Sequence, residues 1–400
     1  MPKGTPLSQP YWLRRDGADG IAVVEEPELI GLPENPPVLP IEYYFEVGGE
    51  SLVIADEPGS APGGRRMEVI PPIWMRMVQE VRLLAPGEPG RVEVEVVAAR
   101  AGVRGVLRLA VPAGWKVEPG EQAFDLRKVD EKGRASFVVT PPGDPGVEVL
   151  EAVAEAGGEQ YRTGRFEIRY DHIPHLLLQP PARVKAVAAE VATRGERVGY
   201  FAGAGDAGAE ALEQMGYAVT RLTGADLTME GLAALDAVVV GVRAFNVRGE
   251  LAGGAAALFA YAEAGGTLIV QYNRPDGLKA QPAPFDLRLA NLRVTDETAP
   301  VGFLAPEHPV LNVPNRITPA DFAGWVQERG LYFPAEWDER FTPILAMADP
   351  GSEPLEGALL VARHGKGHVV YTGLAFFRQL PAGVPGAYRL MANLVSLGKS

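Results

Sequence analysis

The feature that most constrains this fold is a change in the pattern of apolar residues near Gly195. Before this point, short segments alternate apolar and polar residues, which is typical of antiparallel strands with one face toward water. After it, residues 236–241 (DAVVVG) are apolar almost throughout, as expected for a strand buried on both faces. The chain is therefore predicted to be multidomain, with an all-β part followed by an α/β part.

The segment 68–170 predicts a β-sandwich of immunoglobulin-like size. Alternating apolar and polar residues occupy 91–97, 105–111, 134–140 and 165–170. Turns rich in proline and glycine separate these segments, such as PPGDPG at 141–146. Trp115 is expected in the core of the sandwich.

The two flanking regions are less regular. Residues 1–67 contain strand-like pieces at 41–47 and 51–54 and a linker rich in proline and glycine, so they predict a partial β segment that is too small for a core of its own. Residues 171–194 predict a linker, in which Pro180 and Pro181 end one unit and 184–191 resembles a strand leading into the next.

The region 195–400 predicts an α/β, doubly wound, Rossmann-like domain. Apolar strands are expected at 197–202, 217–222, 236–241 and 267–272. A helix is expected to end at Met215, and an alanine-rich helix at 251–264 precedes Gly265 and Gly266 as a C-cap. A hairpin at 357–363 and 367–372 and a closing helix at 388–397 complete the prediction.

Composition excludes several classes of function. A net charge of -13 argues against a nucleic-acid partner, since phosphate contacts need clustered Lys and Arg. The chain has no cysteine, which removes disulfides, thiolate nucleophiles and cysteine-based metal sites. No apolar run approaches the roughly 20 residues of a membrane span. The start of the chain has no apolar leader segment, which predicts a cytoplasmic protein if the chain is complete, and a periplasmic or secreted one if it is the tail of an exported precursor.

Long strings in the sequence resemble one protein family. They include GYFAGAGD at 199–206, VVVGVRAFNVR at 238–248, ITPADFAGWVQERGLYFPAEWD at 317–338 and PLSQPYWLR at 6–14. These are similar to the C-terminal region of large bacterial PIG-L/LmbE-type deacetylases, the multidomain relatives of N-acetylglucosaminyl deacetylases. The resemblance implies a catalytic domain upstream that carries an Ala-His-Pro-Asp-Asp zinc motif.

That zinc motif is not present in this sequence. His308-Pro309 comes nearest, but Val310 follows where an aspartate is required. The resemblance therefore transfers no catalytic residue, metal ligand or cofactor. The region 195–400 also resembles the class I glutamine-amidotransferase-like fold, in which a nucleophile follows a strand; the equivalent turn, near 270–275, offers Tyr272 or Asn273, and neither is a suitable nucleophile.

Polar residues follow several of the predicted strands, where ligands bind in parallel sheets. Arginine offers a planar fork to carboxylates, and Asn and Gln both donate and accept toward sugar hydroxyls. Pairing with neighbouring acidic residues, which would merely hold loops, is the competing interpretation for each arginine. The candidate ligand-binding residues are Asp206, Arg243, Asn246, Gln271, Asn273, Arg274 and Arg378.

Three aromatic residues are candidates for a lip against which a sugar ring stacks: Trp325, Tyr332 and Trp337. They lie in or beside a helix expected after Thr318-Pro319. Phe322 and Trp325 have i, i+3 spacing, so core packing is the competing interpretation for Trp325.

Three functional hypotheses follow. The leading one is a non-catalytic accessory region of a PIG-L-type deacetylase that binds carbohydrate or a partner domain, with the deacetylase domain upstream. The second is a hydrolase that uses Asp206, His308 or a bound metal in the α/β domain. The third is a purely structural cap.

Overall fold

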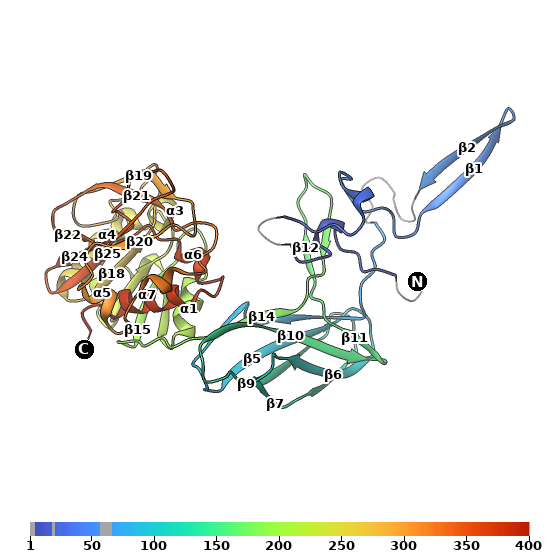
Figure 1. Cartoon of the computed structure of the whole chain (residues 1–400), viewed down its shortest axis with the longest axis horizontal. Coiled ribbons are helices and arrows are strands. Elements are labelled where there is room, and N and C mark those ends of the chain that lie inside the picture. The colour runs from blue at the N-terminus through green and yellow to red at the C-terminus, as the bar shows by residue number, and fades with distance from the viewer. Residues whose placement is uncertain (1–4, 18–20, 57–65, 400) are drawn as a thin grey trace. The chain divides into compact units, whose positions relative to one another are not determined.

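The computed structural model describes residues 5–17, 21–56 and 66–399. The chain divides into two compact units (Figure 1). The first comprises Met1–Glu80, Pro89–Pro141 and Glu148–Lys185, and the second comprises Val81–Glu88, Pro142–Val147 and Ala186–Ser400.

Two larger sheets form the centre of the first unit. One has the strand order β3-β5-β9-β7, with β3 at Ile73–Met77, β5 at Gly90–Ala98, β9 at Lys132–Thr140 and β7 at Lys116–Glu118. The other contains β14-β10-β6-β8, with β14 at Arg183–Ala188, β10 at Gly146–Ala156, β6 at Val103–Ala110 and β8 at Gln122–Leu126. The short strand β11 (Glu159–Tyr161) pairs with β10.

Apolar side chains at alternate positions along the strands fill the space that these sheets enclose. In β5, Val92, Val94 and Val96 are buried, because successive side chains of a strand point to opposite faces. Phe137 of β9 is fully buried, and Trp115 is buried as predicted.

A separate hairpin lies near the N-terminus. Strand β1 (Ile41–Val47) pairs antiparallel with β2 (Glu50–Asp56), so that Tyr43 lies opposite Ile54 and Phe45 opposite Leu52. Nearly every residue of both strands is exposed, and Figure 1 shows the hairpin as a projecting arm. The other short elements here are 3-10 helices η1 (Tyr11–Leu13) and η2 (Pro27–Leu29).

The segment 171–194 is not a simple linker. Strand β13 (Leu176–Leu178) pairs with β12 (Phe166–Ile168), and β14 enters one of the larger sheets. Gln179 donates from its side chain to the backbone oxygens of Ser8 and Val69, so this segment and the N-terminal residues belong to one structure. Most of the predicted linker at 59–66 lies outside the described residues.

The second unit contains a seven-stranded sheet with the order β16-β15-β17-β18-β25-β24-β22. Strands β15, β16, β17, β18 and β25 run parallel, and β24 is antiparallel to both β25 and β22. The bounds are β15 Arg197–Phe201, β16 Ala218–Leu222, β17 Ala237–Val240, β18 Thr267–Gln271, β25 Gly367–Thr372, β24 Leu359–His364 and β22 Phe341–Pro343.

The remaining elements surround this sheet or connect its strands. The helices are α1 Gly208–Gln214, α2 Met229–Leu232, α3 Ala244–Val247, α4 Leu251–Ala264, α5 Pro309–Asn312, α6 Phe376–Gln379 and α7 Pro385–Ser396, with 3-10 turns η3 Gly224–Asp226 and η4 Pro319–Phe322. The remaining strands are β19 Leu287–Val294, β20 Val301–Phe303, β21 Gly330–Trp337 and β23 Leu345–Met347. Strand β4 (Val81–Leu84) belongs instead to the sheet that contains β14, with which it pairs.

The prediction of a doubly wound, Rossmann-like domain of the class I glutamine-amidotransferase type is wrong. The protein is mostly β, with 38% strand and 16% helix. A doubly wound sheet alternates strands with helices, but between β18 and β25 the chain forms the two-stranded sheets β19-β21 and β20-β23 and the edge strand β22. Prolines such as Pro275, Pro284 and Pro300 recur through this tract, and proline cannot occupy a helix interior. Helices α2 and α3 are only four residues long.

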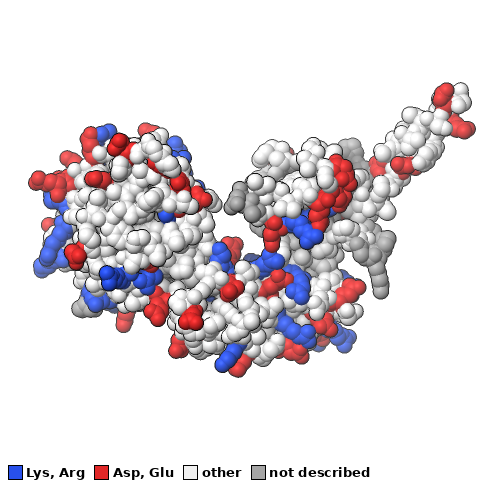
Figure 2. Space-filling view, in the orientation of Figure 1, with Lys and Arg blue, Asp and Glu red and all other residues white. Residues whose placement is uncertain are grey.

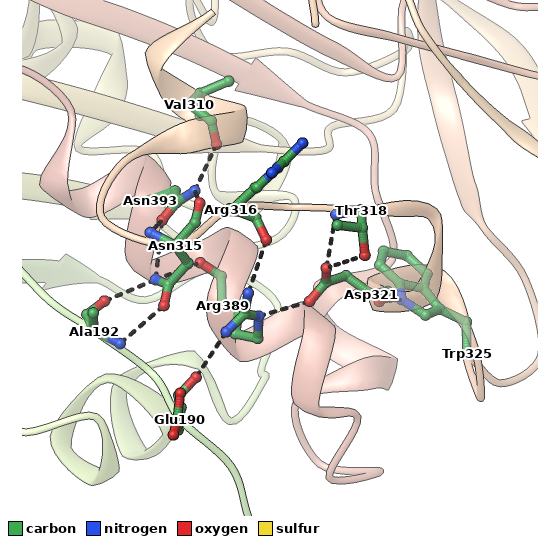
Figure 3. Close-up of polar contacts among 10 residues, drawn as sticks. All are labelled: Glu190, Ala192, Val310, Asn315, Arg316, Thr318, Asp321, Trp325, Arg389 and Asn393. Atoms are coloured by element: carbon green, nitrogen blue, oxygen red, sulfur yellow. Dashed lines mark hydrogen bonds and ion pairs between the residues drawn. The ribbon is translucent and has the colours of Figure 1, made fainter. Parts of the chain in front are cut away.

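A buried amide network fastens the closing helix α7 to the preceding chain (Figure 3). Asn393 on α7 is fully buried; its side-chain amide donates to the oxygens of Val310 (2.9 Å) and Asn315 (2.7 Å). Its oxygen accepts from the backbone N–H of Asn315 over 2.9 Å. Arg389, one turn earlier, donates to the Asp321 carboxylate over 2.7 Å. Every polar atom of the Asn393 side chain is thereby satisfied.

Candidate functional site

Loops at the carboxyl end of the parallel strands meet around Arg243. This residue follows β17 and has a φ of 57°, a left-handed conformation that is uncommon for residues other than glycine. Its backbone N–H donates to the Tyr272 oxygen over 2.8 Å, which joins the loops after β17 and β18. The backbone N–H of Val242, just before it, donates to Asp206 over 3.1 Å, which joins the loop after β15.

Three aromatic rings pack together beside Arg243. The ring of Tyr272 stacks on that of Tyr332, with centroids 5.7 Å apart and an interplanar angle of 21°. Phe377 of helix α6 lies 5.2 Å from Tyr272 between ring centroids. Tyr332 has a φ of 54°, a second left-handed residue in the same place. Tyr272 is buried, whereas Tyr332 and Phe377 are partly exposed and leave aromatic surface accessible.

Arg378 completes the cluster from helix α6. Its guanidinium lies over the Phe377 ring, 4.8 Å from the ring centroid. Its Nε donates to Glu328 over 2.7 Å, and another nitrogen donates to Gln327, which has a φ of 66°. We call Arg243, Tyr272, Tyr332, Phe377 and Arg378 the sheet-edge cluster.

The electrostatics of the sheet-edge cluster are dominated by its two arginines. Burial raises the pKa of the Tyr272 hydroxyl, and the positive charges of Arg243 and Arg378 oppose that rise, so both charges act on this ring. In the described part of the chain, the Nε of Arg243 is buried and has no hydrogen-bond partner. Native structures leave few buried donors unpaired. The Arg243 residue as a whole is only half-buried and no described carboxylate pairs with it, so its guanidinium is a candidate ligand contact.

Four of the predicted site residues hydrogen-bond to neighbouring loops and hold them together: Asp206, Gln271, Asn273 and Asn246. Asp206 accepts from the Tyr200 hydroxyl, and from the backbone N–H groups of Gly208 and Val242. Gln271 is buried and contacts the Tyr200 hydroxyl. Their polar atoms face the protein.

Asn273 and Asn246 act in the same way between the loops after β17 and β18. Asn273 is fully buried; it accepts from the backbone of Phe245 and donates to the Gln271 oxygen. Asn246 exchanges hydrogen bonds with the backbone of Arg274 in both directions. The side chain of Arg274 is exposed at the same edge.

The three residues predicted as an aromatic lip are not together. Trp325 is 3% exposed and packs against Phe322, so the core-packing interpretation describes it. The helix expected around Trp325 is only the short 3-10 turn η4. Trp337, at the far end of β21, packs against a different hydrophobic core. Of the three, Tyr332 alone joins the sheet-edge cluster.

The structure does not bring together Asp206 and His308, the two residues of the hydrolase hypothesis. Burial lowers the pKa of His368, at the start of β25, and the charges of Arg363 and His308 lower it further, so His308 lies near that end of the strand. Asp206 instead follows the end of β15, so Asp206 and His308 lie at opposite edges of the parallel sheet. The His308 ring accepts from the backbone N–H of Val310 as a helix N-cap, and burial lowers its pKa.

Sequence reasoning missed the partners that organise this cluster. Tyr272 was considered only as a nucleophile position, and Gln327 and Glu328 were not considered at all. A left-handed backbone at Gln327 and Tyr332 leaves no recognisable sequence signal. The sequence offered two clues to this cluster: Arg274-Pro275 directly after Asn273, and Phe376-Phe377-Arg378 after β25.

Comparisons with known proteins add little. No family model matches this sequence, and no curated protein matches it. Among solved structures, a family 123 glycoside hydrolase from Clostridium perfringens has 6% identity and a TM-score of 0.19 over 32% of this chain and 30% of that chain. Alpha-2-macroglobulin of E. coli has 11% identity and a TM-score of 0.22 over 36% of this chain and 8% of its own. The CaCohA2 protein of Clostridium acetobutylicum has 9% identity and a TM-score of 0.16 over 29% of this chain and 90% of its own. At these scores the likenesses carry no argument about fold or function.

Two further properties concern partners. Among the described residues, no helix is both long and apolar enough to cross a membrane. On the face shown in Figure 2, acidic and basic side chains are interspersed.

Proposed function

We propose that this chain is a non-catalytic accessory region of a PIG-L-type deacetylase that binds carbohydrate through the sheet-edge cluster. The observation that carries the proposal is Arg243: a left-handed arginine with a buried, unpartnered Nε in the described part of the chain, beside partly exposed aromatic rings. Strained backbone of this kind costs about 1–3 kcal/mol, and it concentrates at binding sites.

The chemistry of the cluster fits a sugar that carries a carboxylate. The rings of Tyr332 and Phe377 offer an apolar face to the C–H groups of a pyranose ring. The guanidinium of Arg243 can donate to a carboxylate, which accepts but does not donate. Arg378 adds positive charge, although Glu328 neutralises part of it.

Of the three arginines that the sequence offers as candidate ligand residues, Arg243 and Arg378 differ in role. Arg243 is assigned to the ligand, because no described carboxylate pairs with it. Arg378 is assigned to positioning, because it holds the Phe377 ring and pairs with Glu328.

The experiment compares two sugars that differ in one carboxylate. N-acetylmuramic acid and N-acetylglucosamine are titrated against the purified chain, with binding followed by saturation-transfer NMR. N-acetylmuramic acid should bind more tightly, and Arg243→Asn should weaken its binding by about 10- to 100-fold, the value of a hydrogen bond to a charged group.

The matched control is Arg274→Ala, because Arg274 is an exposed arginine on the neighbouring loop. Binding by this variant should equal that of the wild type. Failure of both sugars to bind, or equal binding by Arg243→Asn, would reject the proposal and leave the structural-cap hypothesis in place.

A further inference from the structure

The first unit contains a cavity of about 750 Å³ that none of the sequence predictions used. Volumes of 300–1,000 Å³ are characteristic of sites for small organic molecules. Its walls come from residues near η1, from 34–38, from 66–68 and from 169–177, which brings both ends of the unit's sequence together.

Hydrogen bonds hold these walls in place. Asn35 accepts from the Tyr11 backbone N–H over 2.8 Å and donates to the Gln9 oxygen over 2.8 Å. Gln9 in turn accepts from the backbone N–H of Gln179, just beyond β13. These hydrogen bonds therefore link the segments that line the cavity to one another.

Two aromatic side chains border the cavity. Trp12 is partly buried and has the Tyr11 ring against it in an edge-on contact, with centroids 4.8 Å apart. Tyr170 is 63% exposed and also borders the cavity, with the His172 ring 5.7 Å away between centroids. Two aromatic side chains suit a ligand with flat apolar faces, such as the C–H faces of sugar rings.

The polar lining of the cavity includes two contacts between a basic side chain and a carboxylate, and Arg169 and Asp171 line it as well. Arg66 donates to Glu34 over 2.5 Å. His175 lies 3.5 Å from Glu68, between ring nitrogen and carboxylate oxygen. Each pair places acceptors next to donors, which matches hydroxyl groups that both donate and accept. A charged ligand group would instead compete with one partner of each existing pair.

We propose that this cavity binds neutral carbohydrate, with sugar rings against Trp12 and Tyr170 and hydroxyls on the Glu34–Arg66 pair. The site is independent of the sheet-edge cluster and differs from it in chemistry. Arg243 offers a guanidinium that no described carboxylate pairs with, whereas the Arg66 guanidinium of the cavity is already paired with Glu34.

The test uses three tetrasaccharides on the intact chain: cellotetraose, chitotetraose and tetragalacturonate. Isothermal titration should show binding of at least one of the two neutral tetramers. Tyr170→Ala should weaken that binding by about 3- to 10-fold, as loss of one aromatic contact does. Because Tyr170 is largely exposed, this variant should keep the wild-type melting temperature.

A matched control makes the outcome specific. Tyr44→Ala removes a tyrosine of similar exposure, 70%, from the β1-β2 hairpin outside the cavity, and it should bind as the wild type does. The inference is overturned if neither neutral tetramer binds, if Tyr170→Ala binds them as tightly as Tyr44→Ala, or if only tetragalacturonate binds.

Discussion

The Nε of Arg378 donates to a buried carboxylate oxygen of Glu328 over 2.7 Å, which ties helix α6 to the chain just before β21. The Glu328 side chain is only 6% exposed, and Arg293 is a second, more distant partner at 3.5 Å. This pair gives the sheet-edge cluster its rigidity, because Arg378 also lies over the Phe377 ring.

Replacement of Arg378 by alanine should therefore destabilise the second unit. Removing one partner of a fully buried pair costs about 3–5 kcal/mol; because Arg378 is partly exposed and Arg293 remains, we expect about 2–3 kcal/mol. Urea unfolding followed by circular dichroism measures this. Adding Glu328→Gln to the Arg378→Ala variant should restore part of the loss, and a loss below about 0.5 kcal/mol would show that the pair is not a clamp.

Arg243 should behave in the opposite way. Asparagine tolerates the left-handed backbone better than arginine does, so Arg243→Asn should leave the free energy of unfolding within about 1 kcal/mol of the wild type or raise it. Arg243→Val, with a β-branched side chain at the same φ of 57°, should lower it by more. Thermal melts of the two variants measure the difference, and equal melting temperatures would contradict the assigned backbone strain.

The regular elements of the second unit could be predicted from the sequence. Helix α4 has the predicted bounds, Leu251–Ala264, because an alanine-rich run ends at a glycine that caps it. Strands β17 and β18 lie where continuous apolar residues placed them. The order of elements between β18 and β25 was not predictable in the same way, since short strands such as β20 are stabilised by partners distant in sequence.

In the candidate sites, too, the positions set by regular elements could be predicted, whereas contacts between residues distant in sequence could not. That Arg243 and Arg378 follow strands of one sheet could be predicted from apolar runs alone. The stacking of Tyr332 on Tyr272 could not, because it depends on a backbone turn that the sequence does not signal. The cavity of the first unit was missed because residues 1–67 have too few apolar positions to predict where they pack.

The carboxylate of Glu167 should make the first unit sensitive to acid. Burial alone would raise the pKa of Glu167, but hydrogen bonds from Arg165, Arg169 and His175 outweigh it and lower the pKa to about 2 from the ordinary 4.5. A carboxyl group with a lowered pKa stabilises the folded state above its unfolded pKa. That stabilisation should disappear as the pH falls from about 4.5 to about 2.

Glu167→Gln should therefore reduce the slope of stability against pH within this window. Thermal melts at about pH 6, 4 and 3 provide the measurement, with the exposed Glu148→Gln as the control. Equal slopes for the two variants would show that the Glu167 interactions do not stabilise the fold.

The amide network around Asn393 should be essential to the second unit. Asn393→Leu would leave the oxygens of Val310 and Asn315 and the Asn315 N–H without their partner. Each unsatisfied buried group costs about 1–3 kcal/mol, so a total of roughly 3 kcal/mol or more is expected. Denaturant unfolding should show this, whereas Asn312→Ala, on the more exposed helix α5, should cost much less.

The β1-β2 hairpin should contribute almost nothing to global stability, despite its apolar residues. Phe45 is 47% exposed and Leu52 51% exposed, and each is the cross-strand partner of the other. A two-stranded hairpin without a packed face is marginally stable at best in water, and its amides should exchange far faster than those of buried strands. Phe45→Ser combined with Leu52→Ser should therefore leave the melting temperature of the isolated chain within about 1 °C of the wild type, because neither side chain packs into a core.

The matched control is Phe137→Ser, which removes a fully buried ring from β9 and should unfold the first unit. Hydrogen exchange should find the β1 and β2 amides unprotected in both the wild type and the double variant. A fall of several degrees in the double variant, or slow exchange in β1 and β2, would mean that the hairpin is packed against protein in solution.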